Sequence, residues 1–105
     1  MADAATLMAA MQEKAPLLRR LGYRMRFDLT DLGESVLLDA TGSDCTIEQV
    51  DETAEADTVL RMSADNLDKL MAGRLSPMLA FSTGRLRIEG SKGVALKLAS
   101  LLDEE

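Results

Sequence analysis

The sequence predicts an α+β domain whose sheet begins as an antiparallel meander. Two changes in the spacing of apolar residues indicate this class. Helical spacing over residues 4–21 gives way to alternation between residues 23 and 63, and helical spacing then returns around one further alternating segment at residues 85–89. A run of strands followed by helices is typical of α+β domains. A length of 105 residues, with 47% hydrophobic and 29% charged residues, predicts one globular domain over residues 1–105.

The first predicted element is an interrupted helix over residues 4–21. Its apolar stripe consists of Leu7, Met11, Ala15 and Leu18. Pro16 has no backbone donor, so the helix is expected to kink or restart there. Gly22 is the expected stop.

The next segment predicts a β-hairpin with one buried face. Residues 23–30 alternate, and their apolar members are Tyr23, Met25, Phe27 and Leu29. The segment DLGE turns the chain, with Gly33 available for a positive φ. A register that opposes Thr30 to Ser35 matches both faces, because it produces the pairs Phe27 with Leu38, Leu29 with Val36, Met25 with Ala40, and Arg26 with Asp39.

Two more strands complete the predicted meander. The turn TGSD leads to a strand over residues 45–50, whose expected partners are Ala40 for Cys45 and Leu38 for Ile47. The acidic segment DETAEAD is expected to be an exposed loop. Residues 58–63 form the fourth strand, with Leu60 and Met62 on one face.

Helices and a fifth strand follow. Ser63 is expected to cap a helix over residues 64–72, and Ser76 with Pro77 begins a short helix that ends before Gly84. Residues 85–89 predict the fifth strand, with Leu86 and Ile88 inward. The last helix opens after Gly90, and its apolar stripe is Val94, Ala95, Leu98, Leu101 and Leu102.

Composition argues against several classes of function. The chain has no histidine, which removes the commonest general base and the imidazole metal ligand, so no metal, no cofactor and no enzymatic activity are expected. The single Cys45 is expected to be a buried structural thiol. A net charge of -6 argues against nucleic acid as a partner. The absence of a secretory signal and of a long apolar run predicts a cytoplasmic protein, and no feature indicates an oligomeric state.

The charges are nevertheless segregated along the chain. The two basic groups are Lys14, Arg19, Arg20, Arg24 and Arg26, and Arg74, Arg85, Arg87, Lys92 and Lys97. Twelve acids occupy residues 28–68 between them, with Arg61 as the only base ahead of Lys69. Two interpretations remain open: solvated faces that attract one another within the fold, or a basic rim that meets anionic lipid headgroups or an acidic partner.

An ordered set of short pieces covers residues 57–102. It comprises an Asp-led strand at residues 57–63, a helix at residues 66–71, Gly73-Arg74-Leu75, Ala80-Phe81, Gly84-Arg85-Leu86-Arg87-Ile88, Gly90, and a helix at residues 94–102. The order and spacing of these pieces resemble the sterol carrier protein 2 family, in the form of a small stand-alone bacterial-type member. The resemblance extends more loosely back to residue 17.

This resemblance implies a five-stranded, mainly antiparallel sheet covered on one face by helices. It also implies an apolar tunnel between sheet and helices that binds fatty acyl, sterol-like or isoprenoid lipids. Ser82-Thr83 stands where relatives often have Met-Gln, and Glu89 where a lysine is frequent, so the tunnel lining and basic rim are expected to differ here. The chain ends without the peroxisomal tripeptide of many eukaryotic members, which weakens the case for a peroxisomal location and for sterol.

Two sets of candidate site residues follow from these stripes and the resemblance. The expected apolar lining is Phe27, Leu29, Met62, Leu70, Met71, Met78, Phe81, Ile88, Leu98 and Leu102, and for each of them plain core packing is the alternative. The candidate headgroup or membrane contacts are Arg74, Arg85, Arg87 and Lys92.

Two functions remain open for this sequence. The leading hypothesis is non-catalytic binding and intracellular transfer or solubilisation of a hydrophobic lipid, with transient contact with a membrane surface. The alternative is an accessory module that presents a lipid intermediate to a biosynthetic enzyme, for example in quinone biosynthesis.

Overall fold

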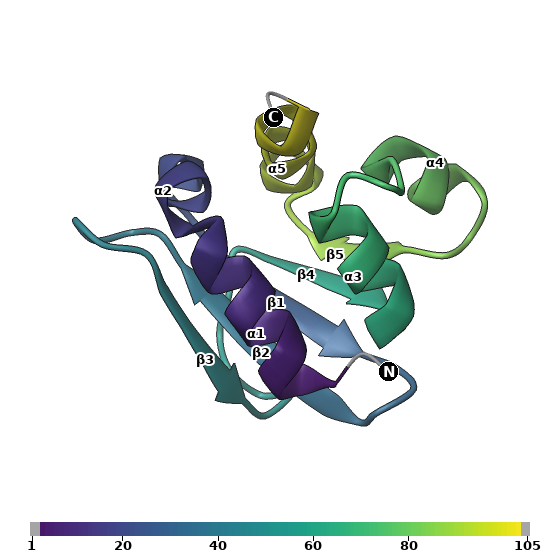
Figure 1. Ribbon diagram of the computed structural model, residues 1–105, viewed down its shortest axis with the longest axis horizontal. Coiled ribbons are helices and arrows are strands. Elements are labelled where there is room, and N and C mark those ends of the chain that lie inside the picture. The colour runs from purple at the N-terminus through teal and green to yellow at the C-terminus, as the bar shows by residue number, and fades with distance from the viewer. Residues whose placement is uncertain (1–2, 104–105) are drawn as a thin grey trace.

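Five strands form one mixed sheet in the computed structural model, which describes residues 3–103 (Figure 1). The sheet order is β3-β2-β1-β4-β5, with bounds β1 Arg24–Leu29, β2 Glu34–Asp39, β3 Thr46–Val50, β4 Thr58–Met62 and β5 Arg87–Gly90. All neighbours are antiparallel except β1 and β4, which run parallel. The α+β class and the five-stranded, mainly antiparallel sheet are therefore confirmed. The predicted four-strand meander is wrong, because β4 pairs with β1 and not with β3.

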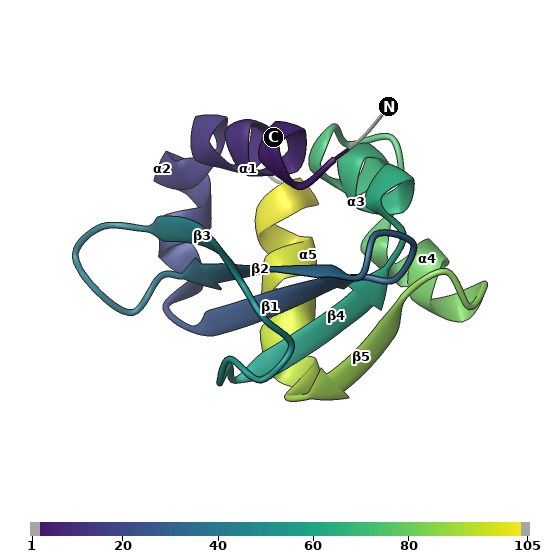
Figure 2. The ribbon, with the colours of Figure 1, turned by 90° about the horizontal axis from the view of Figure 1, so that it is seen from below.

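The connection between β3 and β4 explains this difference. Residues 51–57 leave the β3 edge and cross the outer face of β2 and β1 before β4 begins (Figure 2). Asp57 anchors the end of this crossing segment on β1, because its backbone N–H donates to the Arg24 carbonyl oxygen at 2.9 Å and its Oδ2 accepts from the Arg24 N–H at 2.9 Å. The alternation of β4 would bury the same side chains whether β4 paired with β3 or with β1. The side-chain pattern alone therefore does not choose between these two positions.

The crossing segment also buries an arginine on the outer face. Arg26 is only 8% exposed. Its Nη1 donates to the Ala54 carbonyl oxygen at 2.8 Å, and its Nε donates to Asp28 Oδ1 at 2.8 Å. Ser35 also donates to that carboxylate, at 2.7 Å. The segment therefore lies against the sheet, although its glutamates remain exposed as predicted.

The register of the first hairpin differs from the prediction by two residues. Phe27 pairs with Val36, and Arg24, not Arg26, lies opposite Asp39 and forms the ion pair with it at 3.2 Å. The four-residue turn closes on Leu29, whose carbonyl oxygen accepts from the Gly33 N–H at 2.9 Å while Gly33 adopts φ 65°. A shift of two preserves which face each side chain occupies, so the apolar pattern could not detect it.

The rest of the predicted register is largely correct. The pair of Leu38 with Ile47 is confirmed, and the β2–β3 ladder ends at Asp39 with Thr46, one pair short of Ala40 with Cys45. Tyr23 does not share the buried face, because it precedes β1 and is exposed, with Lys97 Nζ 5.3 Å from its ring centroid. The fifth strand begins two residues later than predicted.

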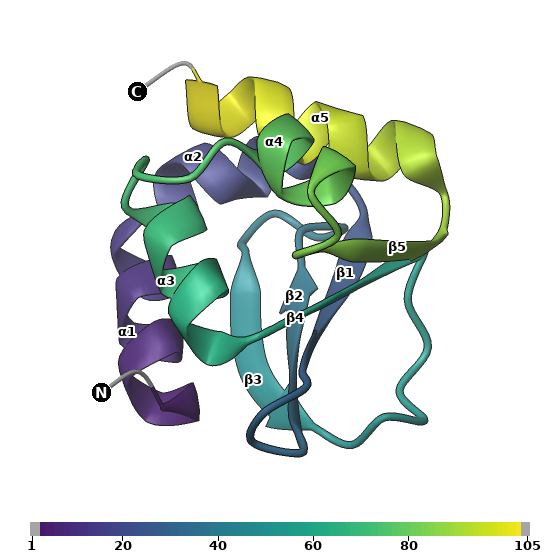
Figure 3. The same ribbon diagram turned by 90° about the vertical axis from the view of Figure 1, so that its right-hand side faces the viewer.

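The helices cover one face of the sheet, as the resemblance implied (Figure 3). They are α1 Ala4–Glu13, α2 Ala15–Leu18 with the following 3-10 turn Arg19–Leu21, α3 Ala64–Met71, α4 Pro77–Ser82 and α5 Lys92–Asp103. The predicted interruption near Pro16 is confirmed, since that proline sits in the first turn of α2, and Gly22 ends the segment at φ 75°. The Ser63 hydroxyl caps α3 by accepting from the Asn66 N–H at 3.2 Å.

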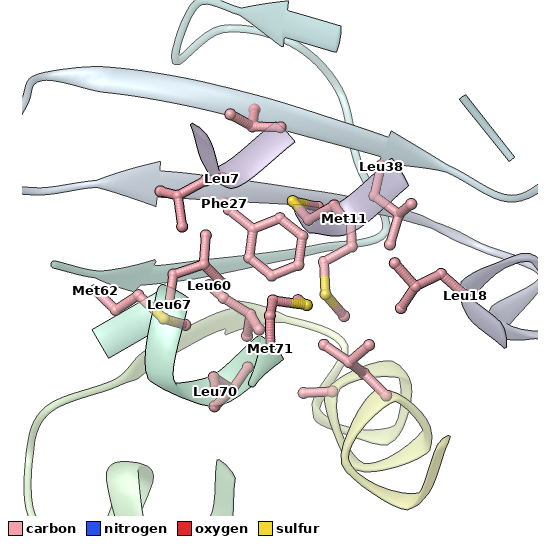
Figure 4. Packing of buried hydrophobic residues seen from close by; sticks show 14 of the residues in the cluster. Leu7, Met11, Leu18, Phe27, Leu38, Leu60, Met62, Leu67, Leu70 and Met71 are labelled. Carbon is pink, nitrogen blue, oxygen red and sulfur yellow. The ribbon is translucent and has the colours of Figure 1, made fainter. Parts of the chain in front are cut away.

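The hydrophobic core lies between the sheet and α1, α3 and α5 (Figure 4). Phe27 occupies its middle, and Leu7 and Met11 of α1 and Leu67 and Met71 of α3 pack around it. All five of these side chains are at most 1% exposed. The half of the sheet under α1 is therefore filled, which leaves the β4–β5 edge as the place where space remains.

Candidate functional site

An apolar cavity of about 200 Å³ lies between α4, α5 and the β4–β5 edge of the sheet, and we refer to it as the α4–α5 cavity. Strand alternation directs Leu60 of β4 and Ile88 of β5 into it, and these two residues pair across the strands. Its complete lining is Leu60, Leu70, Pro77, Met78, Phe81, Leu86, Ile88, Lys92, Ala95, Leu96, Leu98 and Ala99. Lys92 is the only charged residue in that set.

Two alanines help to create this space. Ala95 and Ala99 lie one turn apart on α5 and both line the α4–α5 cavity. An alanine side chain ends at Cβ, so α5 leaves space beside its backbone at these two positions. A larger side chain at either alanine position would occupy part of the cavity.

The cavity opens between two helices that expose apolar side chains. Met78, Phe81 and Leu96 line the opening and, with the adjacent Leu79, are 42–54% exposed; we refer to these four residues as the apolar rim. Soluble proteins rarely gather several large exposed apolar side chains around one opening without a ligand or partner for them. Three of the rim residues belong to α4, a helix of six residues that follows Gly73 and precedes Gly84.

The structure brings together half of the predicted lining. Leu70, Met78, Phe81, Ile88 and Leu98 all line the α4–α5 cavity. The other members lie elsewhere: Phe27, Leu29, Met62 and Met71 are at most 2% exposed within the core, and Leu102 borders a hollow at the C-terminal end of α3.

The four basic candidates are also separated. Lys92 lines the α4–α5 cavity, whereas Arg74 borders the same hollow as Leu102. Arg85 and Arg87 line a different hollow, on the other side of β4 and β5. The geometry therefore leaves Lys92 as the candidate charge at the cavity opening.

Sequence reasoning missed several lining residues. The spacing of apolar residues predicts inward faces for Leu60, Leu86 and Ala95, but it does not distinguish a cavity lining from a filled core. Pro77 was expected only as a helix start. Leu96 and Ala99 fall outside the predicted apolar stripe of the last helix, so no sequence signal indicated them.

Reactive and metal-binding groups do not gather at this cavity. Burial is the main cause that raises the pKa of the Cys45 thiol, followed by the nearby Asp39 carboxylate, so the thiol is neutral near pH 7. Among residues 3–103 no group of three or more His, Cys, Asp or Glu side chains is arranged to hold a metal ion. Within the same residues, no helix combines the length and apolar character needed to cross a bilayer.

Comparison with known proteins identifies the family. The model of the SCP-2 sterol transfer family matches residues 4–103. This chain belongs to the SCP-2 sterol transfer family. Membership places it among lipid-binding and lipid-transfer domains, a class that agrees with an apolar cavity whose lining contains one charge.

A curated relative of this SCP-2 domain is hydroxysteroid dehydrogenase-like protein 2 of Bos taurus, which is 40% identical over 50 residues. The match covers 48% of this chain and only 12% of the relative, so it concerns a small part of that protein.

Solved structures agree in fold. The sterol carrier protein-2 like-3 of Aedes aegypti is 13% identical with a TM-score of 0.74, and the match covers 100% of both chains. The UbiJ-SCP2 ubiquinone synthesis protein is 20% identical with a TM-score of 0.64, covering 88% of this chain and 75% of the other.

Proposed function

We propose that this SCP-2 domain binds the apolar part of a lipid in the α4–α5 cavity, and that it transfers or solubilises that lipid without catalysing a reaction. The observation that carries this proposal is the combination of an apolar lining with an open apolar rim. A sealed apolar void would be a packing defect, whereas an opening surrounded by exposed Met78, Phe81 and Leu96 provides a route for an apolar ligand.

The size of the cavity limits what it can hold. A cavity of about 150 Å³ accommodates benzene, and sites for drug-sized ligands span about 300–1,000 Å³. At roughly 30 Å³ for each carbon, by analogy with a water molecule in the liquid, the 200 Å³ space takes about six or seven carbons. The ligand is therefore the end of an acyl or isoprenoid chain, with the remaining carbons lying against the apolar rim.

Burial of that chain end supplies the binding energy. Each methylene removed from water contributes about 0.8 kcal/mol, so six contribute roughly 5 kcal/mol before the costs of association. Lys92 is the one charged residue at the opening, so it is the best placed of the four predicted basic contacts to orient an anionic headgroup. Arg74, Arg85 and Arg87 border other hollows and are proposed for contacts outside the cavity.

The apolar rim is also suited to transient contact with a membrane surface. Residues 69–88, which include α4, contain four basic residues and no acidic residue, although the whole chain carries a net charge of -6. Anionic lipids attract such a segment, and exposed apolar side chains enter the interface between headgroups and acyl chains. Lipid would then pass between the bilayer and the cavity along the rim.

The direct test is native mass spectrometry of gently purified protein, followed by organic extraction and lipid identification. We expect a bound lipid, or uptake of one fatty acid per chain after delipidation. The double variant Met78→Ser/Phe81→Ser is expected to take up less fatty acid and to bind anionic vesicles more weakly. Leu32→Ser, which removes an exposed leucine from the β1–β2 turn, is the matched control. A bare mass that takes up no fatty acid, acyl-CoA, sterol or quinone-like lipid would contradict the proposal.

A second candidate is an accessory role in which the domain presents a lipid intermediate to a biosynthetic enzyme. The similarity in fold to the UbiJ-SCP2 ubiquinone synthesis protein favours it, and the apolar rim offers a surface that an enzyme could cover. This role predicts a specific protein partner in a pull-down, weak uptake of free lipid, and loss of that partner in the Met78→Ser/Phe81→Ser variant. Free lipid uptake with no partner favours the transfer role.

A further inference from the structure

A second hollow, of about 410 Å³, lies on the opposite side of β4 and β5 from the α4–α5 cavity, and we refer to it as the arginine hollow. Its lining is Thr30, Arg61, Met62, Ser63, Asn66, Gly84, Arg85 and Arg87. Alternation along the chain separates the two spaces, because Leu60 and Leu86 line the cavity while their neighbours Arg61 and Arg87 line the hollow. The chain has 18 acidic residues, yet none of them lines this hollow.

The charges in the arginine hollow are incompletely neutralised. Arg61 has carboxylate partners, since its Nε lies 2.5 Å from Glu89 and 3.5 Å from Asp28. Arg85 and Arg87 form no ion pair or side-chain hydrogen bond with any residue that the structure describes. Two positive charges therefore remain without a carboxylate partner at this place.

The pairing of β4 and β5 brings like charges face to face. Arg61 and Arg87 are direct partners in the antiparallel register. Like charges directly opposite on neighbouring strands destabilise a sheet, and here the carboxylates of Glu89 and Asp28 offset the charge of Arg61. Among the residues that the structure describes no carboxylate offsets Arg87, so a negatively charged ligand would relieve the repulsion that remains.

Polar groups complete the surroundings of these arginines. Thr30, Ser63 and Asn66 also line this hollow, and hydroxyl and side-chain amide groups are neutral hydrogen-bond donors. Two of the backbone amides at the start of α3 already have partners, because Ala64 N–H donates to Asp31 and Asn66 N–H donates to Ser63. Recognition in this hollow therefore depends mainly on the arginine side chains.

We propose that the arginine hollow binds a phosphate-class anion, either a phosphate monoester or a pyrophosphate group. Arg85 and Arg87 supply two positive charges for a dianion, and the planar guanidinium fork matches two phosphate oxygens at once. Arg61 contributes a third guanidinium that Glu89 holds in place. The phosphate belongs either to a soluble ester or to the headgroup of an anionic lipid. This site does not depend on lipid binding in the α4–α5 cavity.

The test uses the full 15N-labelled chain at constant, low ionic strength. Inorganic phosphate and pyrophosphate are titrated while the Nε–H signals of Arg85 and Arg87 and the side-chain amide of Asn66 are followed by NMR. We expect shifts that saturate in the millimolar range. The Arg85→Ala/Arg87→Ala variant should bind at least about tenfold more weakly, because two charge-assisted contacts are lost. Both arginines are exposed, so this variant is expected to fold.

Matched controls separate a site from general attraction. Lys69→Ala/Arg74→Ala also removes two positive charges, from exposed positions outside the hollow, and should leave phosphate binding unchanged. Arg85→Lys/Arg87→Lys keeps both charges but loses the forks, so its affinity should lie between those of the wild type and the alanine variant. Equal weakening by Lys69→Ala/Arg74→Ala, or the same shifts with chloride, would overturn the proposal.

A vesicle-binding experiment shows whether the phosphate belongs to a soluble ester or to a lipid headgroup. Binding to phosphatidylcholine vesicles with and without phosphatidic acid is compared for wild type and Arg85→Ala/Arg87→Ala. Saturable binding of free phosphate supports a soluble ester. Binding only to phosphatidic acid vesicles, lost in this variant but kept in Lys69→Ala/Arg74→Ala, supports a headgroup bound in the hollow rather than general attraction to the basic segment. If neither probe distinguishes the variant from the wild type, the proposal is wrong. Fatty acid uptake by the same variant should be unchanged, so failure here stays separate from failure of the lipid site.

Discussion

Filling the α4–α5 cavity from α5 is the most direct way to ask whether its empty space serves a ligand. Ala99 lines the cavity and is 7% exposed. The substitution Ala99→Leu adds three carbons, which occupy roughly 90 Å³ if each carbon takes about 30 Å³. That is nearly half of the 200 Å³ available.

In Ala99→Leu, the affinity for a fatty acid and the free energy of unfolding of the empty protein are expected to change in opposite directions. The new side chain excludes about three methylenes of ligand, each contributing about 0.8 kcal/mol, so affinity for a fatty acid should fall by about 50-fold. The same three carbons bury apolar surface in the empty protein, so its free energy of unfolding should rise by about 1–2 kcal/mol, less than the full transfer value because some strain is expected. A residue that belonged only to a filled core would not show this opposition.

The assay combines titration of delipidated protein with a fluorescent fatty acid and urea unfolding without ligand. Ala9→Leu is the control, because it makes the same exchange at an exposed position of α1 and should change both quantities little. Unchanged fatty acid affinity in Ala99→Leu, with the stability gain present, would refute the assignment of this cavity as the lipid site. A loss of stability would show that the space does not accept a leucine.

Three further predictions concern the fold that holds the cavity. Gly90→Ala should lower the free energy of unfolding by about 3 kcal/mol, because φ is 86° and an added Cβ would lie 2.8 Å from a backbone oxygen of the crossing segment. Gly84→Ala, at φ 77° with nothing within 4 Å, should lose only about 1–2 kcal/mol in the same urea experiment; equal losses would contradict the close approach. The Thr41 hydroxyl and backbone N–H hold the pKa of Asp39 below its ordinary value, so this carboxylate stabilises the fold above the unfolded pKa of about 3.9 and loses that effect as pH falls through its lower folded pKa. Asp39→Asn should therefore be less stable at pH 7 by under about 1 kcal/mol, and the difference should shrink as pH falls below the unfolded pKa of this carboxylate; a difference that does not change with pH would refute this account. Arg26→Met should lower the free energy of unfolding by about 3 kcal/mol and speed cleavage of residues 51–57 by a glutamate-specific protease, and unchanged cleavage would show that other contacts hold this segment.

Elements defined by local signals could be predicted from the sequence. The break near Pro16, the stop at Gly22 and the cap at Ser63 each depend on residues a few positions apart, and all three appear in the structure. The inward faces of β1 and β4 follow from alternation, which is also local. Because these signals act within one or two turns of the chain, no knowledge of the remaining fold is needed to interpret them.

Strand order and register required the tertiary structure. The placement of β4 beside β1 depends on residues 51–57 crossing the sheet, where Arg26 and Asp57 bond with partners about 30 positions away. The two-residue error in the first hairpin arose because both registers bury the same face. In each case, alternatives with the same side-chain pattern differ only in contacts between distant parts of the chain.

Periodicity and short motifs in the sequence establish the α+β class, the family resemblance and most of the side chains that turn inward. Which inward residues line a cavity depends on how the elements pack in three dimensions: Phe27 meets α1 and α3 and is enclosed, whereas Leu98 faces a space left beside Ala95 and Ala99. Both are apolar residues on buried faces. Whether such a residue contacts protein or empty space depends on how much of the surrounding space is filled by side chains of other elements. A single stretch of sequence does not specify this.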